Sequence, residues 1–211
     1  MLALSHPAID VVSPRIYGLI LDSKALAARL LPDGLIGSPY EILDYRATLV
    51  LHDPEGRRAT FRRTQRVRFL QDGVAAILDH FWGDGVQLAN YRHTAGPIAD
   101  SFKDRGRRHL VIDLERPMGG GETLSFEVER TAMVGFTAAE EWLETTIDHP
   151  IRRLTRTIIF PHERPCRSAR LVVGERVLPL AVKQLRDGRT AVQVRIANPQ
   201  ADTPYTIHWS W

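Results

Sequence analysis

Residues 205–211 alternate strictly between two kinds of side chain. Tyr205, Ile207, Trp209 and Trp211 are aromatic or β-branched, and the residues between them are small or polar. Because side chains along a β-strand point alternately to opposite faces, this pattern predicts a strand with one apolar and one polar face. The segment holds two of the four tryptophans of the chain. We therefore expect the strand to join a sheet and to bury its aromatic face in the core.

From residue 40 onward, turn residues separate strand-like segments at intervals of about eight to twelve positions. This spacing is typical of an all-β, mainly antiparallel β-sandwich. Asp53–Gly56 and Gln71–Gly73 have the composition of tight turns. The predicted strands are 40–51, 58–70, 74–82, 86–91, 108–115, 122–131, 153–160, 167–173, 176–180, 190–197 and 204–211.

The segment Leu114–Val128 consists of a loop, a Gly-Glu pair and an alternating strand. It resembles the late strands of many immunoglobulin-like sandwiches over about fifteen residues. The resemblance implies an immunoglobulin-like general character for the fold. It assigns no functional residue, because unrelated functions share this architecture.

Two segments favour a helix. Residues 23–31 are rich in strong helix formers, and Pro32–Gly34 would end the helix. Thr137–Glu140 matches a capping box, which predicts a helical turn at 138–143 before the chain becomes extended.

These patterns predict how the chain is organised. We expect residues 1–39 to be a lead-in that carries the short helix, with no role predicted for residues 1–14. Residues 40–211 are predicted to form the β-sandwich domain, and a division into two β lobes would fall near residues 132–140.

The composition, 44% hydrophobic and 25% charged with a net charge of +3, is that of an ordinary globular protein. Lys24, Lys103 and Lys183 are the only lysines among the 28 basic residues, and so small a charge excess does not indicate nucleic-acid binding by itself. The single cysteine, Cys166, excludes an intramolecular disulfide. Without an export signal or an apolar stretch of about 20 residues, the sequence predicts a cytoplasmic protein that makes no membrane contact.

The strongest charge pattern lies on the predicted strand 58–70. One face of this strand carries Arg58, Arg62, Arg66 and Arg68. The arginines could be solvated or paired across the sheet, for instance with Glu127 and Glu129 if their strand lay adjacent. They could also contact the acidic surface of a partner protein or the phosphates of a nucleic acid.

Aromatic residues cluster around the turns predicted between residues 81 and 102. Trp82, Tyr91 and Phe102 belong to this cluster, and Arg105 is close to it in sequence. Exposed Trp, Tyr and Arg side chains are typical of interface hot spots. The stretch 91–108, predicted as a long loop, is therefore a candidate contact surface, with burial of its rings in the core as the alternative.

The sequence contains no recognisable nucleophile motif. Asp79, His80, Asp84 and His93 are the candidates for an acid–base site. Adjacent residues of a strand point to opposite faces, so Asp79 and His80 would each need a partner from elsewhere.

Metal and phosphate sites have no positive support either. His162 and Cys166 lack the companion pair that structural zinc needs, and Gly119–Gly121 is not followed by a phosphate-loop lysine. We therefore predict no metal and no cofactor.

Together these patterns favour a non-catalytic interaction module, an accessory or regulatory subunit that binds a protein partner. An enzyme with its site around Asp79–His93 and a nucleic-acid-binding protein that uses Arg58–Arg68 are the alternatives.

Overall fold

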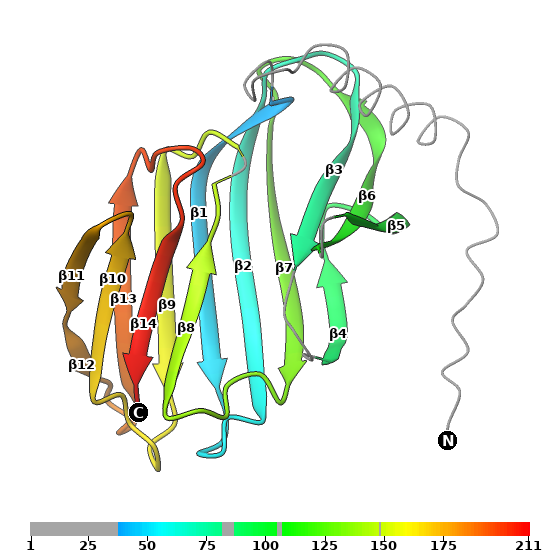
Figure 1. Cartoon of the computed structure of the whole chain (residues 1–211). Helices are drawn as coiled ribbons and strands as arrows, with labels where there is room; N and C mark the ends of the chain where they lie inside the picture. The colour runs from blue at the N-terminus through cyan, green and yellow to red at the C-terminus, as the bar shows by residue number, and fades with distance from the viewer. Residues whose placement is uncertain (1–37, 82–86, 105–106, 148) are drawn as a thin grey trace, which may run out of the picture.

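The computed structural model describes residues 38–81, 87–104, 107–147 and 149–211 (Figure 1). Within these ranges the chain forms strands and turns and contains no helix, and most strand pairs are antiparallel. The predicted all-β, mainly antiparallel class is confirmed. The helix predicted at 23–31 lies outside the described residues. A separate finding is that no helix in the described ranges is long and apolar enough to cross a membrane.

The turns predicted at Asp53–Gly56 and Gln71–Gly73 connect consecutive strands, and three further strands appear that the sequence pattern did not predict. The strands of the described residues are β1 (Tyr40–Leu51), β2 (Arg58–Phe69), β3 (Val74–Phe81), β4 (Gln87–His93), β5 (Ile98–Asp104), β6 (Arg107–Met118), β7 (Thr123–Met133), β8 (Glu140–Thr145), β9 (Arg153–Phe160), β10 (Ser168–Val173), β11 (Arg176–Leu180), β12 (Val182–Gln184), β13 (Thr190–Ala197) and β14 (Tyr205–Ser210).

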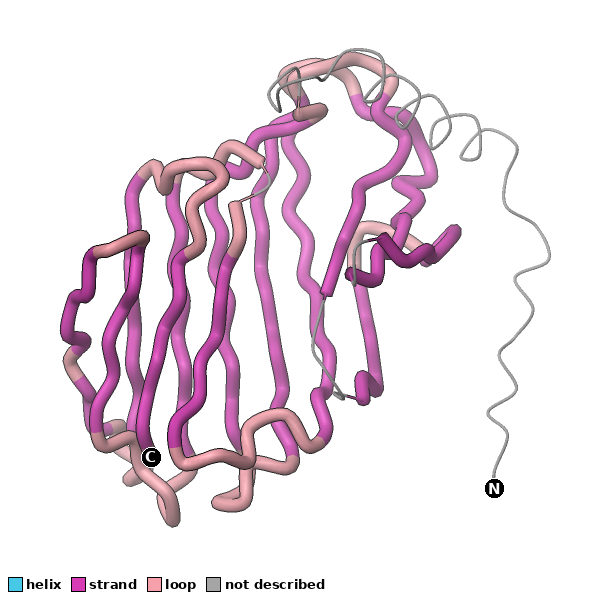
Figure 2. The backbone as a smooth tube through the Cα atoms, viewed as in Figure 1, coloured by secondary structure: helices cyan, strands magenta, loops and turns pink. Residues whose placement is uncertain are grey.

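The strands form three sheets. A seven-stranded sheet has the order β12-β13-β9-β1-β2-β7-β4, a four-stranded sheet has the order β11-β10-β14-β8, and a three-stranded sheet has the order β3-β6-β5. Figures 1 and 2 show the four-stranded sheet in front of the half of the large sheet that contains β13, β9 and β1. The pairing of β1 with β9 is parallel, whereas β1 with β2 is antiparallel.

The last strand is buried, as its alternation predicts. β14 pairs with β10 on one side and with β8 on the other. Trp209 and Trp211 are 3% and 4% exposed, and their ring centres lie 5.9 Å and 6.0 Å from that of Phe160 in β9. These aromatic contacts pack the four-stranded sheet onto the large sheet.

Both smaller sheets cover the same face of the large sheet. Arg63 of β2 and Arg156 of β9 lie opposite Ala47 of β1, so their side chains share one face. Arg63 contacts Asp79 of β3, and Arg156 contacts Thr145 of β8. Each of the two smaller sheets therefore contacts this face of the large sheet through a polar side chain.

Two expectations from the sequence need correction. The helical turn at 138–143 is wrong, because residues 140–145 form β8 and pair with β14 along their whole length. In place of a helix cap, the carboxylate of Glu141 accepts a hydrogen bond from the Ala138 N–H at 2.7 Å, and the chain stays extended. The stretch 91–108 is also not one long loop, because it contains β5, which pairs with β6.

Candidate functional site

Three surfaces or clusters are candidates for a site, and the first is the outer face of β2. Arg62 donates a hydrogen bond from Nε to Oε2 of Glu129 in β7 at 2.7 Å. Arg68 forms an ion pair with Glu41 of β1. Arg66 lies opposite Ser125 of β7. The cross-strand pairing considered from the sequence is thus present for two of these arginines.

The other residues predicted to contact a partner do not lie together on one described surface. Trp82 and Arg105 lie outside the described residues. Phe102 is in β5, opposite His109 of β6. Tyr91 turns its hydroxyl towards the protein interior and donates a hydrogen bond to Oδ2 of Asp79 at 2.8 Å.

Asp79 is the centre of the second candidate, a buried polar cluster between β3 and the large sheet. Its other carboxylate oxygen accepts a hydrogen bond from Nη2 of Arg63 at 2.8 Å. Burial alone would raise the pKa of Asp79, but Arg63, Arg130 and the Tyr91 hydroxyl outweigh burial and lower the pKa to about 2. Asp79 is therefore ionised and firmly bound at neutral pH.

The neighbours of Asp79 are also held in one protonation state. Burial lowers the pKa of His93 to about 4, so its ring is neutral at pH 7, and the ring stacks on Phe126 at a centroid distance of 4.8 Å. Burial and the negative charge of Asp79 raise the pKa of Tyr91. A general base should have a pKa near the working pH, so this cluster suits charge recognition and structural support better than proton transfer.

The structure brings Asp79 and His93 together but not the whole set proposed from the sequence. His80 follows Asp79 in β3, opposite His109, and Asp84 lies outside the described residues. Sequence periodicity also missed Arg63 and Arg156. A signal was present, since each arginine lies in phase with apolar residues of its strand, such as Phe61 in β2.

No metal site is evident in the described ranges, where no three His, Cys, Asp or Glu side chains gather closely enough to hold an ion. Cys166 is buried, and burial raises the pKa of its thiol to about 11. The thiol donates a weak hydrogen bond to the carbonyl oxygen of Ser168 at 3.4 Å. Cys166 is thus an unreactive core residue.

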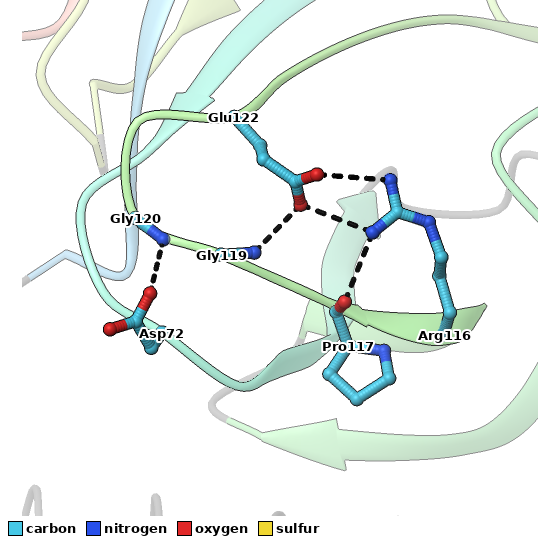
Figure 3. Close-up of polar contacts among 6 residues, drawn as sticks. All are labelled: Asp72, Arg116, Pro117, Gly119, Gly120 and Glu122. Atoms are coloured by element: carbon cyan, nitrogen blue, oxygen red, sulfur yellow. Dashed lines mark hydrogen bonds and ion pairs between the residues drawn. The ribbon is translucent and has the colours of Figure 1, made fainter.

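The glycine-rich loop between β6 and β7 binds carboxylates of its own chain (Figure 3). The N–H of Gly119 donates to Glu122 at 2.7 Å, and that of Gly120 donates to Asp72 at 2.6 Å. Arg116 holds Glu122 in an ion pair at 3.1 Å. These two N–H groups are therefore occupied by acceptors of the chain itself.

The third candidate is the outer face of the four-stranded sheet. Trp142 of β8, His208 of β14, Arg170 of β10 and Pro179 of β11 lie opposite one another in register across the four strands. They line a hollow with a volume of about 440 Å³. Trp142 is 52% exposed, which is unusual for a tryptophan on a regular strand. Its exposure was not predicted, because the capping pattern of residues 137–140 favoured a helical turn over this segment.

The known proteins that resemble this chain match it over only part of their own length. No family model matches the chain. Rat mitochondrial carnitine O-palmitoyltransferase 2 is 27% identical over 115 residues, which cover 52% of this chain and 16% of that protein. A putative protease from Parabacteroides distasonis has a similar fold, with a TM-score of 0.50, 11% identity, and coverage of 83% of this chain and 41% of that one.

An M1 zinc metallopeptidase from Deinococcus radiodurans matches with a TM-score of 0.49 and 12% identity, over 80% of this chain and 42% of that one. The chain therefore spans less than half the length of each of these three proteins. At such low identity the likeness to the solved structures concerns the fold alone.

Proposed function

We propose that this chain is a non-catalytic accessory module, immunoglobulin-like in general character and cytoplasmic, that binds a protein partner through the outer face of its four-stranded sheet. The observation that carries the proposal is the half-exposed indole of Trp142 beside the hollow. Val177, 59% exposed on β11, lines the other side of the same hollow. Tryptophan is enriched among the residues that dominate binding energy at interfaces.

The position of Trp142 suits an extended partner segment. Among the described strands, β8 pairs only with β14, so it forms one edge of the four-stranded sheet. An edge strand offers backbone N–H and C=O groups on which a partner strand can add, and neighbouring side-chain pockets then supply selectivity. Trp142 lies within this edge strand and is placed to contact such a side chain.

Charge on β8 defines the chemistry of the partner. Glu140 and Glu144 are two residues from Trp142 on either side, so all three side chains project from one face of the strand. Two carboxylates that flank an exposed indole favour a partner segment in which an apolar residue is flanked by lysine or arginine. The partner we propose is therefore an extended basic segment with an apolar anchor.

Selection from a random peptide library against the purified protein tests this proposal. We expect the selected peptides to share an apolar residue flanked by basic residues. Trp142→Ala should weaken binding of a selected peptide at least about 30-fold, as expected for an interface hot spot worth 2 kcal/mol or more. The double variant Glu140→Lys/Glu144→Lys should also weaken binding. Fluorescence anisotropy of a labelled peptide measures both effects.

Leu78→Ala provides the matched control, because Leu78 is 47% exposed but belongs to β3 in another sheet. It should leave peptide affinity unchanged. Peptides without basic residues, or equal affinities for the unchanged protein and Trp142→Ala, would contradict the proposal.

A further inference from the structure

Among the described residues, positive charge exceeds negative charge in the buried cluster on the inner face of the large sheet. Arg63, Arg130 and Arg156 bring three guanidinium groups there, and Asp79 supplies one carboxylate. Arg156 is only 6% exposed and forms no ion pair with a described residue. Burial lowers the pKa of Arg156, the direction expected when a buried cation is incompletely compensated.

The sheet register brings two of these cations close together. Arg63 and Arg156 lie directly opposite Ala47, one on each side, and the methyl group of Ala47 is too small to separate them. Their guanidinium carbons lie 5.9 Å and 5.4 Å from the centre of the Tyr45 ring. The guanidinium of Arg156 also lies 5.2 Å from the centre of the Phe61 ring. Both cations therefore converge on the same small aromatic region.

Several buried nitrogen atoms in this region have no hydrogen-bond partner among the described residues. Nη1 of Arg156 and Nε of Arg63 are buried and have no hydrogen-bond partner among these residues, and the same is true of Nε2 of His93. Arg156 uses Nε to bind Thr145 at 2.7 Å, so its side chain is held in place while Nη1 stays available. A buried charged donor without an acceptor is costly, and an anion would remove that cost.

We propose that this cluster is a binding site for a small phosphate-class oxyanion, held between the guanidinium groups of Arg63 and Arg156. Among the described residues, three guanidinium groups and one carboxylate leave two positive charges, which a phosphate dianion neutralises and a monocarboxylate only halves. The planar fork of donors on arginine matches the oxygens of such an anion. The side chain of Arg63 remains 11% exposed, so the cluster reaches solvent at that residue. This cluster is separate from the partner surface around Trp142, which lies on the outer face of the four-stranded sheet.

Thermal unfolding with inorganic phosphate as the probe tests the proposal. Phosphate is varied in the low millimolar range at constant ionic strength, with chloride or acetate as the replacement anion, so that general salt effects stay small. We expect the unfolding temperature to rise with phosphate and to level off, but not to rise with acetate. At a phosphate concentration 100 times the Kd, the ratio of folded to unfolded protein should increase about 100-fold.

Arg156→Met should abolish this response, and it is expected to fold, since it removes the desolvation cost of a buried cation that has no ion-pair partner among the described residues. Arg62→Met is the matched control on the outer face of β2 and should retain the full response. Broadening of the phosphate ³¹P resonance on addition of the unchanged protein gives a second measurement that needs no variant. Equal unfolding temperatures in phosphate, acetate and chloride, together with an unaltered ³¹P linewidth, would overturn the proposal, as would an equal response in Arg156→Met.

Discussion

The indole nitrogen of Trp211 donates a hydrogen bond to the carbonyl oxygen of Ala138, and the two atoms lie 2.9 Å apart. This bond ties the residue that follows β14 to the connection that leads into β8. The guanidinium carbon of Arg164 lies 4.0 Å from the centre of the Trp211 ring, and Arg164 also donates to the Ala138 oxygen at 2.9 Å. Packing, a hydrogen bond and a cation–π contact therefore converge on one side chain.

Trp211→Ala should lower the free energy of unfolding by about 3–5 kcal/mol, the usual cost of removing a buried tryptophan. Urea denaturation followed by circular dichroism measures the change. Trp142→Ala, which removes a half-exposed indole, should change stability by no more than about 0.5 kcal/mol. If both variants unfolded at the same urea concentration as the unchanged protein, Trp211 would not be part of the core.

Gly56→Ala should be more destabilising than Gly73→Ala. Both glycines have a positive φ, 69° and 78°, so alanine is strained at either position by about 1–2 kcal/mol. A Cβ at Gly56 would also lie 1.6 Å from the carbonyl oxygen of Phe136, whereas a Cβ at Gly73 would have no atom within 4 Å. Thermal unfolding of the two variants compares the effects, and equal losses would show that the close approach at Phe136 relaxes without cost.

Local patterning predicted the faces of the strands well. In β2, for example, the alternation placed Arg62 on the outer face, and the structure pairs it there with Glu129. In β1 the same rule failed at one residue. A register shift between Ile42 and Asp44 buries Ile42 and leaves Leu43 only half-buried, whereas strict alternation from Tyr45 would bury Leu43 instead of Ile42. A bulge adds one residue to a strand, and apolar periodicity alone does not reveal it.

The buried cluster could not be predicted because its members meet only through the pairing of sheets. Asp79 and Arg63 belong to different sheets, and the period of each strand says which face a residue takes but not which strand covers that face. The strand at Glu140–Thr145 illustrates the same limit. Local capping residues favoured a helical turn there, and pairing with β14 overrode that preference.

Asp79→Asn should be far more destabilising than Glu129→Gln, although each change removes a carboxylate that binds an arginine. Asp79 and Arg63 are both largely buried, with side-chain exposures of 3% and 11%. Loss of one buried partner leaves an uncompensated cation and costs about 3–5 kcal/mol. The Arg62–Glu129 pair is exposed and should contribute at most about 1 kcal/mol. Urea denaturation at pH 7 compares the variants, and similar costs would mean that the Asp79 cluster is well solvated.

Stability should fall in two steps as the solution is acidified in phosphate-free buffer. The pKa of His93 is about 4 in the folded protein, below the ordinary value of 6.5, because burial disfavours the charged ring. Between these two pH values the unfolded chain binds a proton that the folded protein does not, so stability declines as pH falls from 6.5 to 4. The pKa of Asp79 is lowered from 3.8 to about 2, so its contribution, about 2 kcal/mol, is lost below pH 4.

His93→Gln should separate the two steps. Glutamine does not titrate, so the decline between pH 6.5 and 4 should become smaller while the loss below pH 4 remains. His162→Gln, which alters an exposed histidine of the turn after β9, is the control and should leave both steps as they are. Urea midpoints measured across this pH range for the three proteins provide the comparison. A decline above pH 4 that is the same in all three would assign the acid sensitivity to groups other than His93.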